Sequence, residues 1–165
     1  MNKYDKCVQY ILENQNSFYR IAYCNIHNEY DAQDIVQNSI IKALENINSL
    51  KNGDAIRTWF YRILINECID HIKKGRHETV AELYDTSESA YTENFYEPND
   101  ELLSALLGIS QENRSVILLH IYEELTLKET AAVLNIPLST VKSRYYAGIE
   151  QLKKRLAGNT ERKIS

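Results

Sequence analysis

The sequence predicts an all-α protein made of two small helical domains joined by a flexible acidic linker, with a helix-turn-helix in the second domain. Five glycines and two prolines among 165 residues are few, so tight turns and β-hairpins should be scarce, which favours helices. Apolar residues recur at helical spacing in two stretches, residues 4–78 and 102–156. Between them, residues 79–101 have no sustained apolar period and are rich in Ser, Thr, Asp and Glu, a composition typical of a linker.

The charge of the chain is unevenly distributed. Its net charge is −4 at pH 7, and a net negative charge by itself gives no sign of a nucleic-acid surface. Residues 1–78 carry ten bases and ten acids, residues 79–101 seven acids and no base, and residues 102–165 nine bases and six acids. The acidity therefore belongs to the predicted linker, and the basic C-terminal part suggests a nucleic-acid surface.

Two long helices are predicted in the first domain, residues 1–78. The first begins at Asp31 or its neighbour, and its apolar stripe consists of Val36, Ile40, Ala43, Leu44 and Ile47. The second has the stripe Ile56, Phe60, Ile63, Leu64 and Cys68 and ends near Lys73, Lys74 and Gly75, since cations and a glycine mark helix ends. The turn-forming residues 48–54 separate the two helices.

The helix-turn-helix is predicted in the domain that spans residues 102–165. Thr126 and Glu129 have capping-box spacing at the start of a short helix, whose inner face we expect to carry Leu127, Ala131 and Leu134. The helix stops before Pro137, which suits the first turn of the next helix. A short helix, a tight break and a longer helix make this motif.

The second helix of the motif has two distinct faces. The stripe expected to point inward is Val141, Tyr145, Gly148, Ile149, Leu152 and Leu156. Ser143, Tyr146 and Ala147 point away from that stripe, and Lys142 and Arg144 lie on either side, between the two faces. Hydroxyls and cations in the N-terminal half of such a helix suit reading of the major groove. The plainer alternative is a helical hairpin with a solvated charged face.

Four segments resemble the extracytoplasmic-function (group 4) RNA polymerase sigma factors. Residues 125–144 resemble region 4 of that family, and residues 19–22, 31–38 and 58–63 resemble region 2. Order and spacing hold from about residue 5 to residue 156. The resemblance implies a non-enzymatic protein without cofactors that directs polymerase core to specific promoters and assists DNA melting. The alternative is a stand-alone helix-turn-helix regulator that binds duplex DNA; an interaction module without DNA is a third possibility.

The resemblance also implies roles for particular residues. In region 2, the loop from Asn48 to Ile56 would hold a flipped-out base, and Trp59, Phe60 and Tyr61 could hold unstacked DNA, although the stripe places Phe60 in the core. The residues implied for the −10 element are Asn48, Leu50, Lys51, Trp59, Arg62 and Asn66. Those implied for the −35 element are Thr140, Lys142, Ser143, Arg144 and Tyr146.

The implied partners are promoter DNA, the polymerase core and an anti-sigma factor. The core would be bound at the β′ clamp helices and the β flap, and the clamp surface would consist of Asp34, Gln37, Asn38 and Ile41. The chain departs from the family at Asn38, where an acid is common, at Ala147, where a cation is common, and at Gly108–Ile109, where Leu-Pro is usual.

Several other classes of site have little support in the sequence. Three widely spaced cysteines argue against a disulfide framework. Cys24 with His27, and Cys68 with His71, could chelate zinc, but we expect small buried thiols and no metal site. His120 is expected to be a packed histidine, and catalytic motifs are lacking. With no long apolar stretch and no apolar leader, we expect a cytoplasmic protein without membrane insertion.

Overall fold

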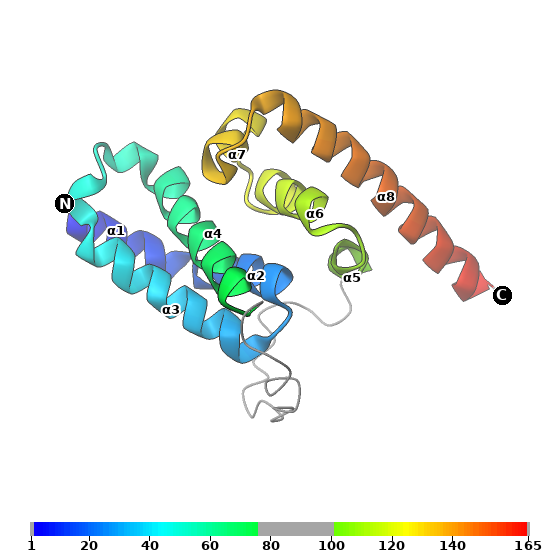
Figure 1. The fold of residues 1–165 in the computed structure, drawn as a ribbon, viewed down its shortest axis with the longest axis horizontal. Coiled ribbons are helices and arrows are strands. Elements are labelled where there is room, and N and C mark those ends of the chain that lie inside the picture. Colours follow the sequence, from blue (N-terminus) through cyan, green and yellow to red (C-terminus); the bar gives the residue numbers. More distant parts are fainter. Residues whose placement is uncertain (1, 76–100, 165) are drawn as a thin grey trace. The chain divides into compact units, whose positions relative to one another are not determined.

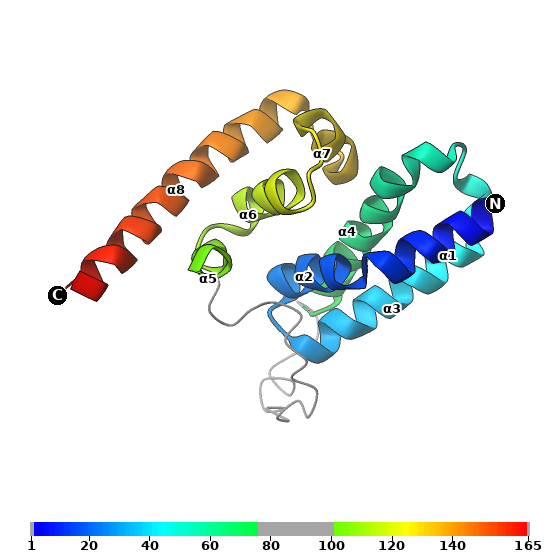
Figure 2. The same ribbon diagram turned by 180° about the vertical axis from the view of Figure 1, so that it is seen from behind.

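The regular elements of the described residues are all helices, which confirms the predicted fold class. The structure is a computed structural model that describes residues 2–75 and 101–164, the last six of these by their backbone alone. Helices α1 to α4 form one compact unit and α5 to α8 a second (Figures 1 and 2). The predicted acidic linker lies outside the described residues, apart from Glu101, which opens α5.

The first unit consists of four α-helices and two short 3₁₀ turns. The helices are α1 (Lys3–Glu13), α2 (Gln15–Ile26), α3 (Glu29–Glu45) and α4 (Ile56–Gly75). The turns, η1 (Ile47–Ser49) and η2 (Gly53–Ala55), lie between α3 and α4. Helix α3 therefore ends before Ile47, which was predicted to be the last residue of its apolar stripe. Helices α2, α3 and α4 pack against one another, and α1 packs on α3 and η1.

Aromatic rings form the centre of this unit's core. The Phe18 and Phe60 rings stack with centroids 4.2 Å apart, and Tyr61 meets Phe18 edge-on at 5.6 Å. All three side chains are fully buried. The core placement predicted for Phe60 is confirmed. Such aromatic contacts add about 0.5–1.5 kcal/mol each to the gain from burial.

The start of α3 depends on local capping. His27 ends α2 in the left-handed region with φ 61°, which turns the chain sharply. The Asn28 side chain then accepts a hydrogen bond of 3.0 Å from the Asp31 amide and caps α3, which begins at Glu29. The helix therefore starts two residues before Asp31, because the asparagine rather than the aspartate is its cap.

The second unit begins with α5 (Glu101–Leu107) and α6 (Gln111–Ile117), which continues into the π-helical turn η4 (Leu118–Tyr122). The wide turn ends where the Leu125 amide donates to the Leu119 carbonyl at 3.0 Å. This bond brings Leu125 into the core, immediately before the N-cap of the next helix.

The helix-turn-helix consists of α7 (Leu127–Leu134) and α8 (Leu138–Ile164). The capping box is confirmed: the Glu129 amide donates to Thr126 Oγ1 and the Thr126 amide to Glu129 Oε1, both at 3.0 Å. Asn135 closes α7 with φ 56°, and the Pro137 carbonyl accepts from the Val141 amide. Pro137 thus directly precedes α8.

The buried face of α7 differs from the sequence-based expectation. Thr130 and Val133 are its buried residues, while Leu127, Ala131 and Leu134 lie half-buried at its sides. A polar residue can occupy this position because the Thr130 hydroxyl donates to the Thr126 carbonyl at 2.9 Å. The hydropathy pattern could not reveal that local partner.

Helices α6 and α8 cross closely in the second unit. An added Cβ at Gly148 would lie 2.4 Å from Ile117 Cδ1 and 3.2 Å from Asn113 Cβ, so the absence of a side chain permits the crossing. Val141, Gly148 and Leu152 are buried, whereas Tyr145, Ile149 and Leu156 are half-buried. The inward stripe predicted for this helix is confirmed.

Candidate nucleic-acid interface

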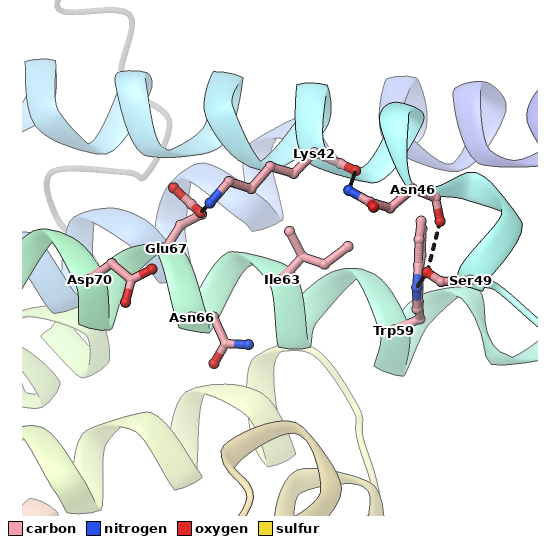
Figure 3. Close-up of a pocket in the computed structure, with 8 residues that line it drawn as sticks. All are labelled: Lys42, Asn46, Ser49, Trp59, Ile63, Asn66, Glu67 and Asp70. Atoms are coloured by element: carbon pink, nitrogen blue, oxygen red, sulfur yellow. Dashed lines mark hydrogen bonds and ion pairs between the residues drawn. The ribbon is translucent and has the colours of Figure 1, made fainter.

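A hollow of about 380 Å³, lined by polar side chains together with Trp59 and Ile63, lies between α3 and α4 of the first unit (Figure 3). Four of its residues, Trp59, Ile63, Asn66 and Asp70, recur every three or four positions along α4. The hollow is lined by Lys42, Asn46, Ser49, Trp59, Ile63, Asn66, Glu67 and Asp70. Ile63 lies between the Trp59 end and the Glu67 end (Figure 3).

A short chain of hydrogen bonds fixes the Trp59 end of the hollow. The indole N–H of Trp59 donates to Ser49 Oγ at 3.1 Å, and the Ser49 hydroxyl donates to the Asn46 carbonyl at 2.7 Å. The Asn46 side-chain amide donates in turn to the Lys42 carbonyl at 2.8 Å. These bonds tie α4 to the end of α3, and they orient a half-buried aromatic ring at the edge of the hollow.

An ion pair spans the opposite end. Lys42 Nζ on α3 contacts Glu67 Oε1 on α4, and this hydrogen bond raises the pKa of Lys42 above its ordinary value. The Glu67 side chain is only 12% exposed, so its carboxylate is held inside the hollow. Ser49 lies in the loop that was expected to hold a base, but Lys42, Asn46, Glu67 and Asp70 were not predicted. Glu67 and Asp70 could have been found from their spacing of two to three turns beyond Trp59 on α4, whereas Lys42 and Asn46 reach the hollow only through the packing of α3 on α4.

The residues implied for −10 recognition fall into three groups. Trp59 and Asn66 both line the hollow. Asn48, Lys51 and Arg62 are exposed outside its lining. Leu50 is 1% exposed, so its side chain fastens the loop to the core and only the rest of the loop is open to DNA.

The role in holding unstacked DNA that the resemblance suggested for Tyr61 is wrong, and for Phe60 the core placement given by the apolar stripe holds instead. Both rings are buried in the aromatic core, so neither offers a free face to a base. Among the three successive aromatic residues, helical geometry turns only Trp59 toward the hollow.

The outer face of α3 is solvated. Asp34, Gln37, Asn38 and Ile41 are all exposed, and Ile41 retains 53% of its accessible surface. The opposite face buries Ala32, Ile35, Val36, Ser39 and Ala43. An exposed isoleucine among polar neighbours on one helix face is compatible with a docking surface, although a single one is also ordinary.

The outward face of α8 is equally open. Lys142, Ser143 and Tyr146 are exposed, Tyr146 by 64%, and Ala147 beside them presents only a methyl group. Thr140 and Arg144 are half-buried at the edges of this face, and Arg144 Nη2 lies 3.9 Å from Glu112 Oε2 on α6. All five residues implied for −35 recognition therefore lie within the first three turns of one helix, on its open face or at the edges of that face.

His120 supports this helix from the interior. Its Nδ1 lies 2.7 Å from the Leu125 carbonyl oxygen, and its ring meets Tyr145 of α8 edge-on at 5.2 Å. The packed histidine predicted from the sequence is confirmed. It links the turn before α7 to the first part of α8.

The cysteines are buried as expected. Cys7, Cys24 and Cys68 have almost no accessible surface, and burial together with the nearby Glu67 charge raises the pKa of the Cys68 thiol to about 12. His71 Nε2 lies 3.3 Å from an Asp31 carboxylate oxygen. Within residues 2–75 and 101–158, no three His, Cys, Asp or Glu side chains gather as metal ligands would. No helix in the described part has the length and apolar character needed to cross a membrane.

The two units match two family models in chain order. Sigma-70 region 2 matches residues 10–78, and Sigma-70, region 4 matches residues 99–152. The chain is 34% identical to the RNA polymerase sigma factor SigV of Bacillus subtilis (strain 168), over 87% of this chain and 86% of the relative. It is 33% identical to the ECF RNA polymerase sigma factor SigW of the same strain, over 86% and 84% of the two chains.

Two solved structures share the fold. The sigma factor RpoE from Bartonella quintana, solved in complex with the anti-sigma factor NepR, superposes with a TM-score of 0.72 at 23% identity, over 90% of this chain and 95% of that one. CnrH, solved in complex with the cytosolic domain of CnrY, superposes with a TM-score of 0.64 at 19% identity, over 92% of this chain and 88% of that one.

Fold, motifs and relatives together define a bacterial transcription initiation factor of the sigma-70 class, which is non-enzymatic. The chain belongs to the extracytoplasmic-function sigma factors, which contain regions 2 and 4, and it directs RNA polymerase to promoters. The stand-alone regulator considered from the sequence does not account for the region 2 unit.

Proposed function

We propose that the two units divide promoter recognition between them, residues 1–78 reading the −10 element and residues 102–165 the −35 element, with 79–101 as the acidic connection. The observation that carries this proposal is the two-sided character of α8. Its inner stripe is buried, and its outer face exposes Lys142, Ser143 and Tyr146. A helix with hydroxyls and cations on an open N-terminal half suits the major groove, where base edges are distinguishable.

At the −35 element, the residues have different tasks. Lys142, Ser143 and Tyr146 extend from the open face and contact base edges or phosphates, while Thr140 and Arg144 at its flanks hold the DNA backbone. Phosphate contacts set the register of the helix, and base contacts give the sequence preference. Ala147 leaves its place on this face without a cation, so the contact that relatives commonly make there is missing.

At the −10 element, the first unit holds melted DNA. Extruding a base costs a few kcal/mol, which stacking and edge hydrogen bonds must offset. Trp59 supplies an aromatic wall and Asn66 an amide, both lining the hollow. Asn48, Lys51 and Arg62 contact the strand around it, and buried Leu50 holds the loop in place.

The outer face of α3 binds the β′ clamp helices of the polymerase through Asp34, Gln37, Asn38 and Ile41. The exposed Ile41 with polar residues around it supports this role, since interfaces combine an apolar centre with a polar rim. The second unit binds the β flap. Asn38 replaces the acid common in relatives, so this contact lacks one charge.

An anti-sigma protein keeps the factor inactive in the cytoplasm until a signal releases it. Two proteins of the same fold, RpoE and CnrH, were solved in complexes with NepR and with the cytosolic domain of CnrY, which supports such a partner. The partner of this chain would cover the polymerase- or DNA-binding faces.

Run-off transcription tests whether the protein directs polymerase through both promoter elements. Matched core polymerase with this protein should yield transcripts from its native promoters, and substitutions in the −10 and −35 elements should each reduce them. The free protein should bind duplex DNA weakly. A footprint from the protein alone, unchanged by polymerase, would contradict the proposal.

A further inference from the structure

Helix α1 presents a row of apolar side chains to solvent. The helix lies along the outside of the first unit (Figure 2), and it buries Cys7 and Ile11 against that unit. Beside these two, Tyr4, Val8 and Leu12 follow one another at four-residue spacing and form one row. Leu12 is 65% exposed, more than any other large apolar side chain in the described part of the chain, and Tyr4 is 50% exposed. One exposed leucine is ordinary, but such a row is a patch.

A groove of about 400 Å³ runs along α1 between this apolar row and a polar one. The polar row consists of Asp5, Gln9 and Glu13, which also have four-residue spacing, and the two rows together make up the lining. Rows of side chains four residues apart are the ridges that interlock when two helices pack against each other. The groove therefore has the form that a ridge of a second helix fills.

The charge of the groove is negative. Asp5 and Glu13 are its charged residues, and none of the described residues in the lining is a base. The side chain of Lys6 lies on another side of α1, where its Cδ would be 3.4 Å from a Cβ added at Gly53. The Gln9 side-chain amide donates to Glu13 Oε1 at 3.0 Å and holds that carboxylate at the rim. An apolar stripe edged by Lys or Arg would complement this surface.

Three other occupants fit this charge poorly. The connecting segment 79–101 carries seven acids and no base, so it would bring more carboxylates to the groove. A second copy of the chain, related by a two-fold axis, would place the same patch on both sides of the interface, with Asp5 and Glu13 of each protomer and no base of the lining to meet them. An anionic lipid surface would be repelled by the same carboxylates.

We propose that the groove of α1 docks an amphipathic helix of a partner protein whose apolar stripe is edged by Lys or Arg. Tyr4 and Leu12 anchor the apolar side chains of that helix, and burial of these two exposed side chains supplies the affinity. Asp5 and Glu13 meet its cations and set its orientation. The residues proposed above for DNA and for the β′ clamp lie on other elements, so the docked helix leaves both of those surfaces free.

The test titrates the full chain, labelled for NMR, with a synthetic peptide of about 14 residues, long enough to lie along the whole of α1. The peptide has leucines on one face and lysines along both edges, and it is cross-linked because so short a helix is marginal alone. It should shift the backbone signals of α1 with a Kd on the order of 100 μM, as expected for a small interface. A second peptide with glutamate at every lysine position should bind at least about tenfold more weakly.

Three variants locate the binding. Leu12→Ser removes the most exposed anchor and should weaken binding of the lysine peptide about tenfold. Ile69→Ser is the matched control, because it makes a similar change at an exposed residue of α4, and it should bind as the wild type does. Glu13→Lys should reduce the preference for the lysine peptide to about threefold or less. All three positions are exposed, so circular dichroism should show unchanged helix content.

The two peptides are decisive on the wild-type protein alone. Shifts centred on another surface would overturn the proposal, as would equal binding of both peptides or full binding by Leu12→Ser. Shifts of the α1 signals on dilution, without peptide, would identify a second copy as the occupant and overturn it too. Insertion of α1 into phosphatidylglycerol vesicles would do the same in favour of a lipid surface. These readouts involve neither promoter nor polymerase, so their failure leaves the proposed function standing.

Discussion

The indole N–H of Trp59 donates a hydrogen bond of 3.1 Å to the hydroxyl of Ser49, ten residues earlier in the chain. Ser49 belongs to the turn that follows α3, and Trp59 to the first part of α4. The bond therefore fixes both the aromatic wall of the hollow and the loop beside it.

Replacing Ser49 with Ala removes the acceptor of the Trp59 indole. We expect a modest loss in the free energy of unfolding, about 0.5–1 kcal/mol because the site is exposed, and a several-fold loss of melted promoter. Permanganate reactivity of unpaired thymines measures the melting. Trp59 is the single tryptophan of the chain, so its fluorescence reports the local change directly. Ser104→Ala, on an exposed position of α5, is the control and should alter neither readout.

Replacing Lys142 with Ala tests the recognition helix. If Lys142 contacts a base, −35-dependent binding by holoenzyme should weaken by about 1–3 kcal/mol. If it contacts a phosphate instead, the slope of log affinity against log salt concentration (the salt slope) should become shallower by about one unit. Titration at several salt concentrations distinguishes the two cases. Lys154→Ala, an exposed lysine farther along α8, is the control. Unchanged binding and an unchanged salt slope would refute the assignment.

Replacing Ile41 with Ser tests the polymerase surface. Ile41 is 53% exposed in the free protein, so stability should hardly change, whereas affinity for core polymerase should fall about tenfold if this side chain anchors the interface. A titration of labelled protein with core enzyme gives the affinity. Ile69→Ser makes the same change at another exposed isoleucine, on α4, and should bind normally. Equal effects of both changes would argue against a specific role for Ile41.

Two glycines of α8 should respond in opposite directions to alanine. Gly148→Ala places a methyl group against buried Ile117, and we expect a net destabilisation of about 1–2 kcal/mol despite the better helix propensity. Gly158→Ala meets nothing within 4 Å and should stabilise the helix by up to about 1 kcal/mol. Thermal unfolding followed by circular dichroism measures both. A stabilised Gly148→Ala protein would show that the crossing of α6 and α8 is looser than described.

Cys68 should make the protein sensitive to alkali. Because burial raises its pKa to about 12, the folded protein holds the thiol proton more tightly than the unfolded chain, where the pKa is near 9. The resulting stability is complete below pH 9 and is lost as the pH rises toward 12. Urea unfolding at pH 8 and pH 10.5 should show a larger loss for the wild type than for Cys68→Ala. All tyrosine and lysine residues are present in both proteins, so their contribution to the change in unfolding free energy cancels in the comparison. An equal loss of stability in the two proteins would contradict the contribution assigned to Cys68.

Much of the second unit could be predicted from the sequence because its signals are local. Thr126 and Glu129 form their capping box within one turn. The spacing of Val141, Gly148 and Leu152 identifies the buried face of α8, and the positions between them are therefore open. Thr130 escaped prediction because its burial depends on a hydrogen bond to the Thr126 carbonyl, which hydropathy does not report.

The sequence by itself determined the class of protein through its family motifs. It also determined the all-helical fold, the capping box of α7 and the faces of α8, since these depend on residues within a few turns of one another. Only the tertiary structure decided the hollow of the first unit. Packing of α3 on α4 brought Lys42 to Glu67, and the tertiary structure buried Leu50 although it lies in a loop. Helical periodicity shows which face of a helix is apolar, but it does not show which neighbour that face meets.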